Sequence, residues 1–175
     1  MANTTFDGPV RSKNGFINIG PGMTKSLTAD TNLTVQDHAG RILLLNDADG
    51  KFTLPAINTN ADSASAGPGS DPNNLNNIGA SFYFYIETAA TDLDIKTTGA
   101  GDLFTGAIML AVNDGSKKAF VPNGSSNDVM TFDGGTAGGL AGSVIQVTAV
   151  DTNNYLVHNS LVIATGTIVT PFADA

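Results

Sequence analysis

The chain has 175 residues, no cysteine and a formal net charge of −8. Its length predicts one domain, and the lack of cysteine excludes disulfides and thiolate metal sites. The eight lysines and arginines form no stripe, which argues against a nucleic-acid partner. No apolar run reaches the length of a membrane span, and the first residues lack the apolar core of a signal peptide. We therefore expect a soluble protein that is synthesised in a cytoplasm and has no membrane partner.

Residues 1–20 are punctuated by Pro and Gly and contain no long apolar run. Four apolar side chains are nevertheless spaced along this segment like anchors on an extended chain. One interpretation is a frayed terminus, and the other is an arm that becomes ordered against another subunit. The second interpretation predicts an extended N-terminal arm, residues 1–20, that contacts a neighbouring protein through Phe6, Val10, Arg11, Phe16 and Ile17.

From residue 21 onward, short apolar runs alternate with turn signals, and no convincing helix separates them. Residues 41–54 form the clearest unit, in which Asp49-Gly50 predicts a tight hairpin turn between two strands. Residues 80–87 alternate cleanly between apolar and amphipathic side chains, as in a strand with one buried face. The expected strands are residues 33–36, 41–45, 51–54, 80–87, 93–97, 103–112 with a bend at Gly106, 118–121, 128–132, 143–150, 155–158 and 160–170.

This series of short strands predicts an all-β fold, a single-domain antiparallel β-sandwich or β-barrel-like domain over residues 21–175. Alternation is the same in both architectures and does not separate them. We see no short repeat period of the solenoid kind. Residues 58–79 form a tract rich in Asn, Ser, Gly and Pro, which we interpret as a long exposed loop that leaves a hairpin rather than as a domain linker.

Few side chains offer catalytic chemistry. Nucleophilic catalysis requires a hydroxyl or thiol next to a base, and only His38 and His158 supply an imidazole. Neither histidine lies in a nucleophile motif, so we expect both to be hydrogen-bonded surface residues. Asp92 and Asp94 share one face if they lie on a strand, where they could bind a cation or flank a sugar.

Three further segments match ligand-binding sequences only in part. Asp47 and Asp49 precede Gly50 as at the start of a calcium loop, but the glutamate that completes such a loop is missing. Residues 134–139 are glycine-rich but lack the Lys and Ser or Thr of a phosphate loop, so tight turns are the simpler interpretation. Aromatic residues 82–85 could stack on a sugar or a base, although alternation places half of them in the core. We therefore expect no catalytic residue, no cofactor and no metal site, and a protein that is not an enzyme.

Several segments together resemble structural proteins of tailed bacteriophage particles, most of all head decoration (cement) proteins of marine phages. They are TTFDGPVRSKNGF, RILLLNDADGKFTLPAI, SFYFYIETAATDLDIKT, GDLFTGAIML, FDGGTAGGLAGSVIQVTAV, NNYLVHNS and ATGTIVTPFADA. The resemblance implies a virion protein on the outer capsid surface that stabilises capsomer contacts. Its partners would be the major capsid protein and copies of itself, as a homotrimer, and the arm would supply the capsid or neighbour contact.

Two rival functions stay open at this stage. A tail-fibre, knob or other receptor-recognition virion protein would carry residues 58–79 at its tip and bind a host surface receptor. A polysaccharide depolymerase would use Asp92 and Asp94 as its carboxylates.

Overall fold

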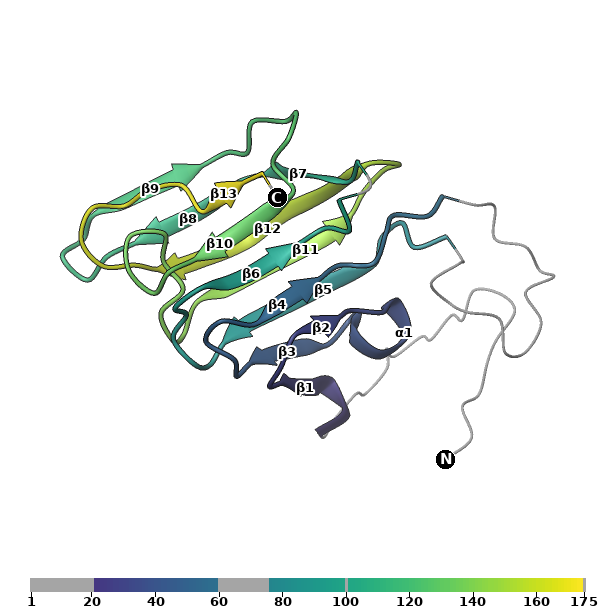
Figure 1. Ribbon diagram of the computed structural model, residues 1–175, viewed down its shortest axis with the longest axis horizontal. Coiled ribbons are helices and arrows are strands. Elements are labelled where there is room, and N and C mark those ends of the chain that lie inside the picture. The colour runs from purple at the N-terminus through teal and green to yellow at the C-terminus, as the bar shows by residue number, and fades with distance from the viewer. Residues whose placement is uncertain (1–20, 60–75, 100, 175) are drawn as a thin grey trace, which may run out of the picture.

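The computed structural model describes residues 21–59, 76–99 and 101–174. Two β-sheets stack against each other, with sheet B in front of sheet A in the view of Figure 1. Sheet A consists of β1 Thr24–Leu27, β3 Ile42–Leu45, β5 Ser81–Ile86, β7 Leu103–Gly106, β8 Ile108–Ala111, β9 Lys117–Phe120, β11 Val144–Ala149 and β12 Asn154–Ile163. Sheet B consists of β2 Thr31–Asn32, β4 Lys51–Thr53, β6 Leu93–Lys96, β10 Val129–Phe132 and β13 Phe172–Ala173. The all-β prediction is confirmed, and the two-sheet arrangement makes the fold sandwich-like rather than a barrel.

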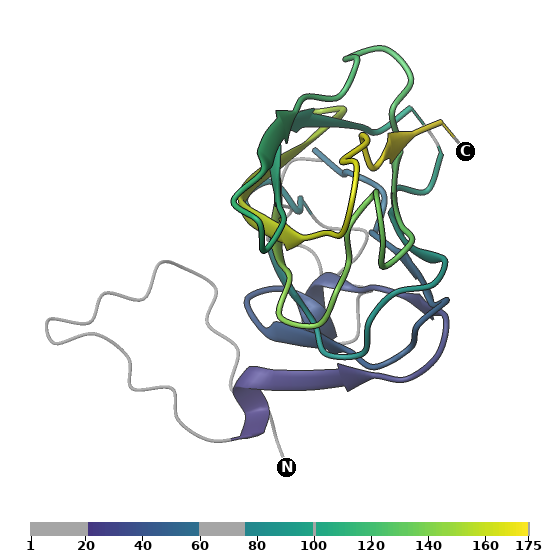
Figure 2. The same ribbon diagram turned by 90° about the vertical axis from the view of Figure 1, so that its left-hand side faces the viewer.

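The order of strands places the start of the described chain at one end of the sandwich. Sheet A runs β1-β3-β5-β11-β12-β8-β9, with β7 also paired to β12, and sheet B runs β13-β10-β6-β4-β2. Figure 2, turned by 90°, shows β1 at the opposite end of the molecule from β9 and β13. The segment that precedes β1 therefore leaves from an edge of sheet A.

Alternate residues of the strands point between the sheets and form the core. In β5, Phe82, Phe84 and Ile86 are fully buried, whereas Tyr83 and Tyr85 are half-buried on the outer side. Because each sheet buries one face only, a period of two in the sequence is enough to fill the core. The largest fully buried side chains are Tyr155, Phe52, Phe82, Phe84, Phe104, Phe132, Leu43, Leu45, Leu54, Ile86, Leu93 and Ile95.

The strand directions differ from the antiparallel pattern that we expected. The first six strands alternate between the two sheets, and each from β3 to β6 pairs in parallel with the strand two places before it. Antiparallel pairing appears only later, for example between β6 and β10 and between β5 and β11. After each early strand the chain turns a corner into the opposite sheet. The strand that returns to the first sheet therefore runs in the original direction.

The turn at Asp49-Gly50 is such a corner and not a hairpin. It connects β3 in sheet A to β4 in sheet B. A Cβ atom on Gly50 would lie 2.7 Å from the ring of Phe52, so glycine at this position lets that ring enter the core. Residues 58–79 likewise connect β4 in sheet B to β5 in sheet A, and the hairpin expected there is also wrong.

These corners generate a repeat that the sequence conceals. In sheet A the aligned residues Thr24, Ile42 and Tyr83 are separated by 18 and then 41 positions. In sheet B, Thr31, Phe52 and Ile95 are separated by 21 and then 43 positions. The second turn is longer by about the length of the polar tract 58–79, so that tract is an insertion into a turn of otherwise regular length.

Two local expectations are corrected. Residues 33–36 do not form a strand, because a short helix α1, Val35–His38, begins there with the Thr34 hydroxyl accepting from the Asp37 N–H at 3.2 Å. A 3-10 turn, η1 Pro21–Met23, precedes β1. None of the helices among the described residues has the length and hydrophobicity to cross a membrane. Near the C-terminus, β12 joins the expected strands 155–158 and 160–170 into one strand, which ends at Ile163 and bulges at Asn159, where φ is 46°.

The bend expected at Gly106 is confirmed. Gly106 separates β7 from β8, which pair side by side with successive parts of β12. Its φ is +89°, and a Cβ atom there would lie 2.2 Å from the carbonyl oxygen of Val157. Only glycine allows the backbone to bend this close to the neighbouring strand.

Candidate functional site

The outer face of sheet A combines apolar side chains with uncharged polar ones. We define the sheet A face as the outward-pointing residues of its strands: Thr24, Ser26, Ile42, Leu44, Ser81, Tyr83, Tyr85, Leu103, Thr105, Met109, Ala111, Lys117, Ala119, Val144, Gln146, Thr148, Asn154, Leu156, His158, Leu161 and Ile163. Their inward-pointing neighbours fill the core.

One apolar row crosses the sheet A face from strand to strand. Strand register places its members next to one another in the order Ala119, Met109, Leu161, Val144, Tyr85 and Leu44. Leu161 in β12 is 48% exposed and Met109 in the neighbouring strand β8 is 44% exposed. Two large apolar side chains therefore face solvent side by side. Contiguous exposed apolar surface of this kind marks an interaction site in soluble proteins.

The described strand residues of the sheet A face include no Asp or Glu, but two carboxylates lie at its rim. Glu87 follows Ile86 on the side of Tyr83 and Tyr85 and accepts from Asn46, and Asp151 accepts from Asn154 at 2.9 Å. This composition of the strands is unusual for the chain, which has 16 acidic residues and 8 basic ones. Among the described strand residues of the sheet A face, Lys117 is the only Asp, Glu, Lys or Arg. It lies in β9, at the edge of the sheet. The acidic charge is therefore carried by loops and by the other surfaces.

A hydrogen-bonded polar cluster lies within this apolar surface. The Thr148 hydroxyl is 2.8 Å from Nε2 of His158 and donates to Oγ of Ser81 at 3.0 Å. Gln146 Nε2 also donates to Ser81 Oγ, and Gln146 Oε1 accepts from Asn159 Nδ2, both at 2.9 Å. His158 therefore belongs to a chain of hydrogen-bonded side chains on the sheet face. His158 is hydrogen-bonded at a half-buried position. The surface position expected for His38 is wrong, because His38 ends helix α1 with its ring buried and only 4% exposed.

Sheet B presents a charged outer face instead. Lys51 Nζ lies 2.9 Å from an Asp92 carboxylate oxygen and 3.0 Å from an Asp94 carboxylate oxygen, and it also donates to the Asp92 carbonyl oxygen at 2.7 Å. The second oxygen of Asp94 accepts from the Thr131 hydroxyl at 2.7 Å. The pKa of Lys51 is raised: burial works against the charged form, but hydrogen bonds to Asp92 and Asp94 outweigh it.

Asp92 and Asp94 do converge, as the sequence suggested, but on an ammonium group of the protein itself. Lys51 Nζ occupies the position between the two carboxylates that a bound cation would take. Asp94 is further committed to Thr131, which leaves no carboxylate of this pair poised over a sugar. The pair therefore gives no support to a depolymerase.

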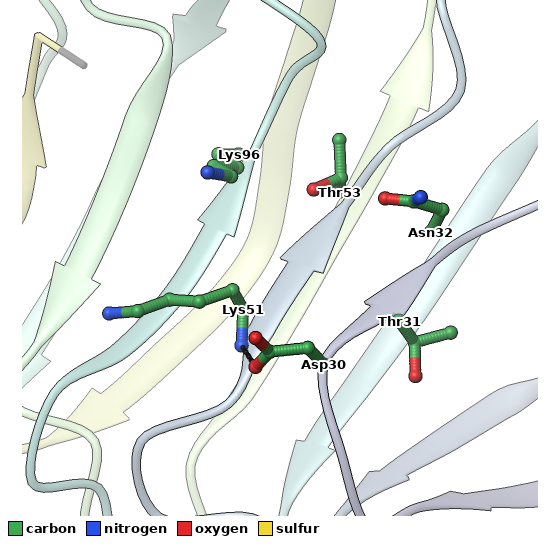
Figure 3. Close-up of a pocket in the computed structure, with 6 residues that line it drawn as sticks. All are labelled: Asp30, Thr31, Asn32, Lys51, Thr53 and Lys96. Atoms are coloured by element: carbon green, nitrogen blue, oxygen red, sulfur yellow. Dashed lines mark hydrogen bonds between the residues drawn. The ribbon is translucent and has the colours of Figure 1, made fainter.

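A shallow hollow of about 270 Å³ adjoins this ion-pair network (Figure 3). It is lined by Asp30, Thr31, Asn32, Lys51, Thr53 and Lys96 from β2, β4 and β6 and the turn before β2. Asp30 is used structurally, because its carboxylate accepts from the Lys51 backbone N–H at 2.8 Å. The hollow is polar and open, unlike the apolar concave pockets that enclose small ligands.

The other ligand-like sequences also have structural roles. Burial and a hydrogen bond shared with Asp49 raise the pKa of Asp47, so these two carboxylates lie close together at the β3–β4 corner. Within residues 21–59, 76–99 and 101–174, no group of three or more His, Cys, Asp or Glu side chains is arranged to hold a metal ion. The Asp133 carboxylate accepts from the backbone N–H groups of Gly135 and Ala137 at 2.8 and 2.9 Å, which confirms the glycine-rich segment as a tight turn.

Hydrogen bonds join the two described ends of the polar insertion, and we call this junction the neck. The Asn58 N–H donates to Asn77 Oδ1 at 2.8 Å, and the Asn77 N–H donates back to the Asn58 carbonyl at 2.9 Å. Asn77 Nδ2 also donates to the Ala56 carbonyl at 2.8 Å, and Asn77 is only 3% exposed. One buried amide therefore holds the two ends of the insertion side by side.

Two further side chains fix the strand that leads into the neck. The buried Asp102 carboxylate accepts from the Ile57 N–H at 2.8 Å, and the Tyr155 hydroxyl donates to the Pro55 carbonyl at 2.6 Å. Burial raises the pKa of Asp102, and burial together with the charge of Asp102 raises the pKa of Tyr155. The insertion is thus displayed from a base whose backbone groups are held by side chains of the core.

The arm residues Phe6, Val10, Arg11, Phe16 and Ile17 lie outside the described residues, so their contact role stays a prediction. Comparisons with protein-family models, with curated proteins and with solved structures find no match to this chain. The functional argument therefore depends on the chemistry of the surfaces described above.

Proposed function

We propose that this chain is a non-enzymatic structural protein of a bacteriophage particle, a capsid decoration (cement) protein. It binds the outside of the phage head and stabilises contacts between capsomers, with the major capsid protein and other copies of itself, as a homotrimer, for partners. The observation that carries this proposal is the sheet A face, whose described strand residues include exposed Ile42, Met109 and Leu161 but no carboxylate, on an otherwise acidic chain. A flat surface of this kind suits protein–protein contact rather than a small substrate.

Such a role needs many repeated contacts and no catalytic centre. Apolar burial contributes about 25 cal/mol per Å², before the entropy of association is subtracted. On a closed shell the same modest contact recurs at every equivalent position, so avidity strengthens attachment. In this proposal the arm, with Phe6, Val10, Arg11, Phe16 and Ile17, supplies the contact to the capsid or to a neighbour by packing or strand addition.

Quantitative mass spectrometry of purified virions tests the proposal directly. A decoration protein is present in a fixed simple ratio to the major capsid protein, whereas a fibre-tip protein is present in few copies. Absence of the chain from the particle would refute a virion role. Deleting residues 2–19 should weaken binding to purified heads, and unchanged binding would exclude the arm as the contact.

Receptor recognition is the second candidate, and the neck formed by Asn58 and Asn77 favours it. Loops presented from a rigid scaffold are a common way to place binding residues. If the insertion recognises a host glycan or outer-membrane protein, replacing residues 60–75 with a short Gly-Ser linker should abolish binding to host cells. Under the decoration proposal, the same replacement leaves binding to heads unchanged.

A further inference from the structure

We propose that copies of this chain associate with one another through the sheet A face. This inference rests on the proposed structural role and names the partner of that surface as another copy of the same chain. Its core is the row of Met109, Leu161, Val144 and Tyr85, which register places side by side across four strands.

Charge permits a second copy as the partner only at the sheet A face. Each copy carries a net charge of −8, so two copies repel each other when acidic surfaces meet. The described strand residues of the sheet A face include no carboxylate, and Glu87 and Asp151 lie only at its rim. The sheet B face carries Asp92 and Asp94 on either side of Lys51. Two copies can therefore bring the central strands of sheet A together without placing one carboxylate against another.

The area of the face is at the lower limit for a specific contact. Seven strands at about 4.8 Å spacing and four to six residues at about 3.3 Å give a surface of roughly 500 Å² per copy. Two such faces bury about 1,000 Å² in total, which is near the lower limit for a specific interface.

The polar groups of the face do not oppose burial. Ser81, Gln146, Thr148 and His158 already hydrogen-bond to one another, so removing water from them leaves few groups unpaired. Internally satisfied polar groups surrounded by Leu161, Met109 and aromatic side chains resemble the composition of the central part of protein interfaces.

The test is the mass of the full chain in solution, measured by sedimentation across a concentration series. The unaltered chain should be oligomeric. Leu161→Glu and Met109→Glu should each raise the dissociation constant by about tenfold or more, because each places an unpaired carboxylate in the contact. Asn32→Glu, an equally exposed change on sheet B, is the matched control and should leave the mass unchanged. Circular dichroism and thermal melting verify that each variant is folded.

Because the chain has no cysteine, one introduced thiol gives a second readout. Leu161→Cys should form disulfide-linked copies on mild oxidation, whereas Asn32→Cys should not. A monomer at every concentration, or an oligomer that Leu161→Glu and Met109→Glu leave intact, would overturn the inference. A monomer that still binds phage heads would leave the proposed function standing. An oligomer that binds no heads would refute the function and retain the self-association surface.

Discussion

At the scale of single residues, Gly106 and Gly115 form a natural matched pair. Their φ angles are +89° and +90°, but a Cβ on Gly106 would meet the Val157 carbonyl oxygen at 2.2 Å, whereas Gly115 has open space around it. Gly115→Ala should therefore lower the free energy of unfolding by about 1 kcal/mol, the effect of the left-handed backbone alone. Gly106→Ala adds a steric clash and should cost roughly 3 kcal/mol. Urea denaturation of the two variants measures the difference, and equal costs would show that the β7–β8 bend adapts freely.

His38 should make stability depend on pH. Its Nδ1 accepts from the Thr34 N–H at 2.9 Å, which leaves the proton of the neutral ring on Nε2, a buried atom with no hydrogen-bond partner among the described residues. Burial and the charges of Lys25 and Arg41 lower the pKa of His38 below 6.5, against the opposing effects of Thr34 and Asp37. The folded state disfavours the charged ring. Stability is therefore full above pH 6.5 and is lost as the pH falls below 6.5 toward the lowered pKa.

Denaturation at a series of pH values between neutrality and mild acid measures this loss. His38→Gln removes the titrating ring and keeps an acceptor for Thr34, so it should flatten the dependence of the free energy of unfolding on pH. His158→Gln, on the sheet A face, is the control and should keep the dependence of the unaltered chain. An unchanged slope in the His38 variant would assign the pH dependence to other groups.

At the scale of elements, the insertion should be dispensable for folding. Asn58 and Asn77 bring its two ends together, so replacing residues 60–75 with Gly-Ser-Gly joins points that are already adjacent. Loop-closure entropy changes slowly with length, and the free energy of unfolding should change by less than about 1 kcal/mol. Asn77→Ala removes two side-chain hydrogen bonds of the neck and should cost about 1–3 kcal/mol in either background. A shortened chain that fails to fold would show that the insertion itself supports the core.

The elements were predictable to the extent that they depend on local pattern. Alternation in residues 81–86 identifies a half-buried strand, and Gly106 identifies a bend, without knowledge of the rest of the chain. Strand direction could not be predicted in this way, because a turn such as Asp49-Gly50 can connect two strands of a hairpin or two strands of opposite sheets. The regular early turns were also hidden, since the insertion at 58–79 breaks their period.

At the scale of the whole molecule, the sheet A face could not be predicted from the sequence. Met109, Leu161, Val144 and Tyr85 are scattered over the chain, and only strand register makes them neighbours. One signal was nevertheless present: the alternation in residues 80–87 puts Tyr83, Tyr85 and Glu87 on the amphipathic side of their strand. Apolar residues on the solvent side of a strand indicate a surface that contacts another molecule. The same alternation could have been examined in every predicted strand of the sheet.

The net charge of the whole molecule predicts how association should respond to salt. Copies with a charge of −8 repel each other at long range, while the sheet A face attracts by apolar burial. Raising NaCl from about 0.1 M to about 1 M shortens the Debye length from about 10 Å to about 3 Å, which removes the repulsion and leaves the burial. The dissociation constant measured by sedimentation should therefore fall with salt, whereas Leu161→Glu should remain dissociated at both concentrations. Association that weakens with salt would indicate ionic contacts, such as Arg11 and Lys13 of one copy against the acidic body of another, and would exclude apolar burial as the main attraction.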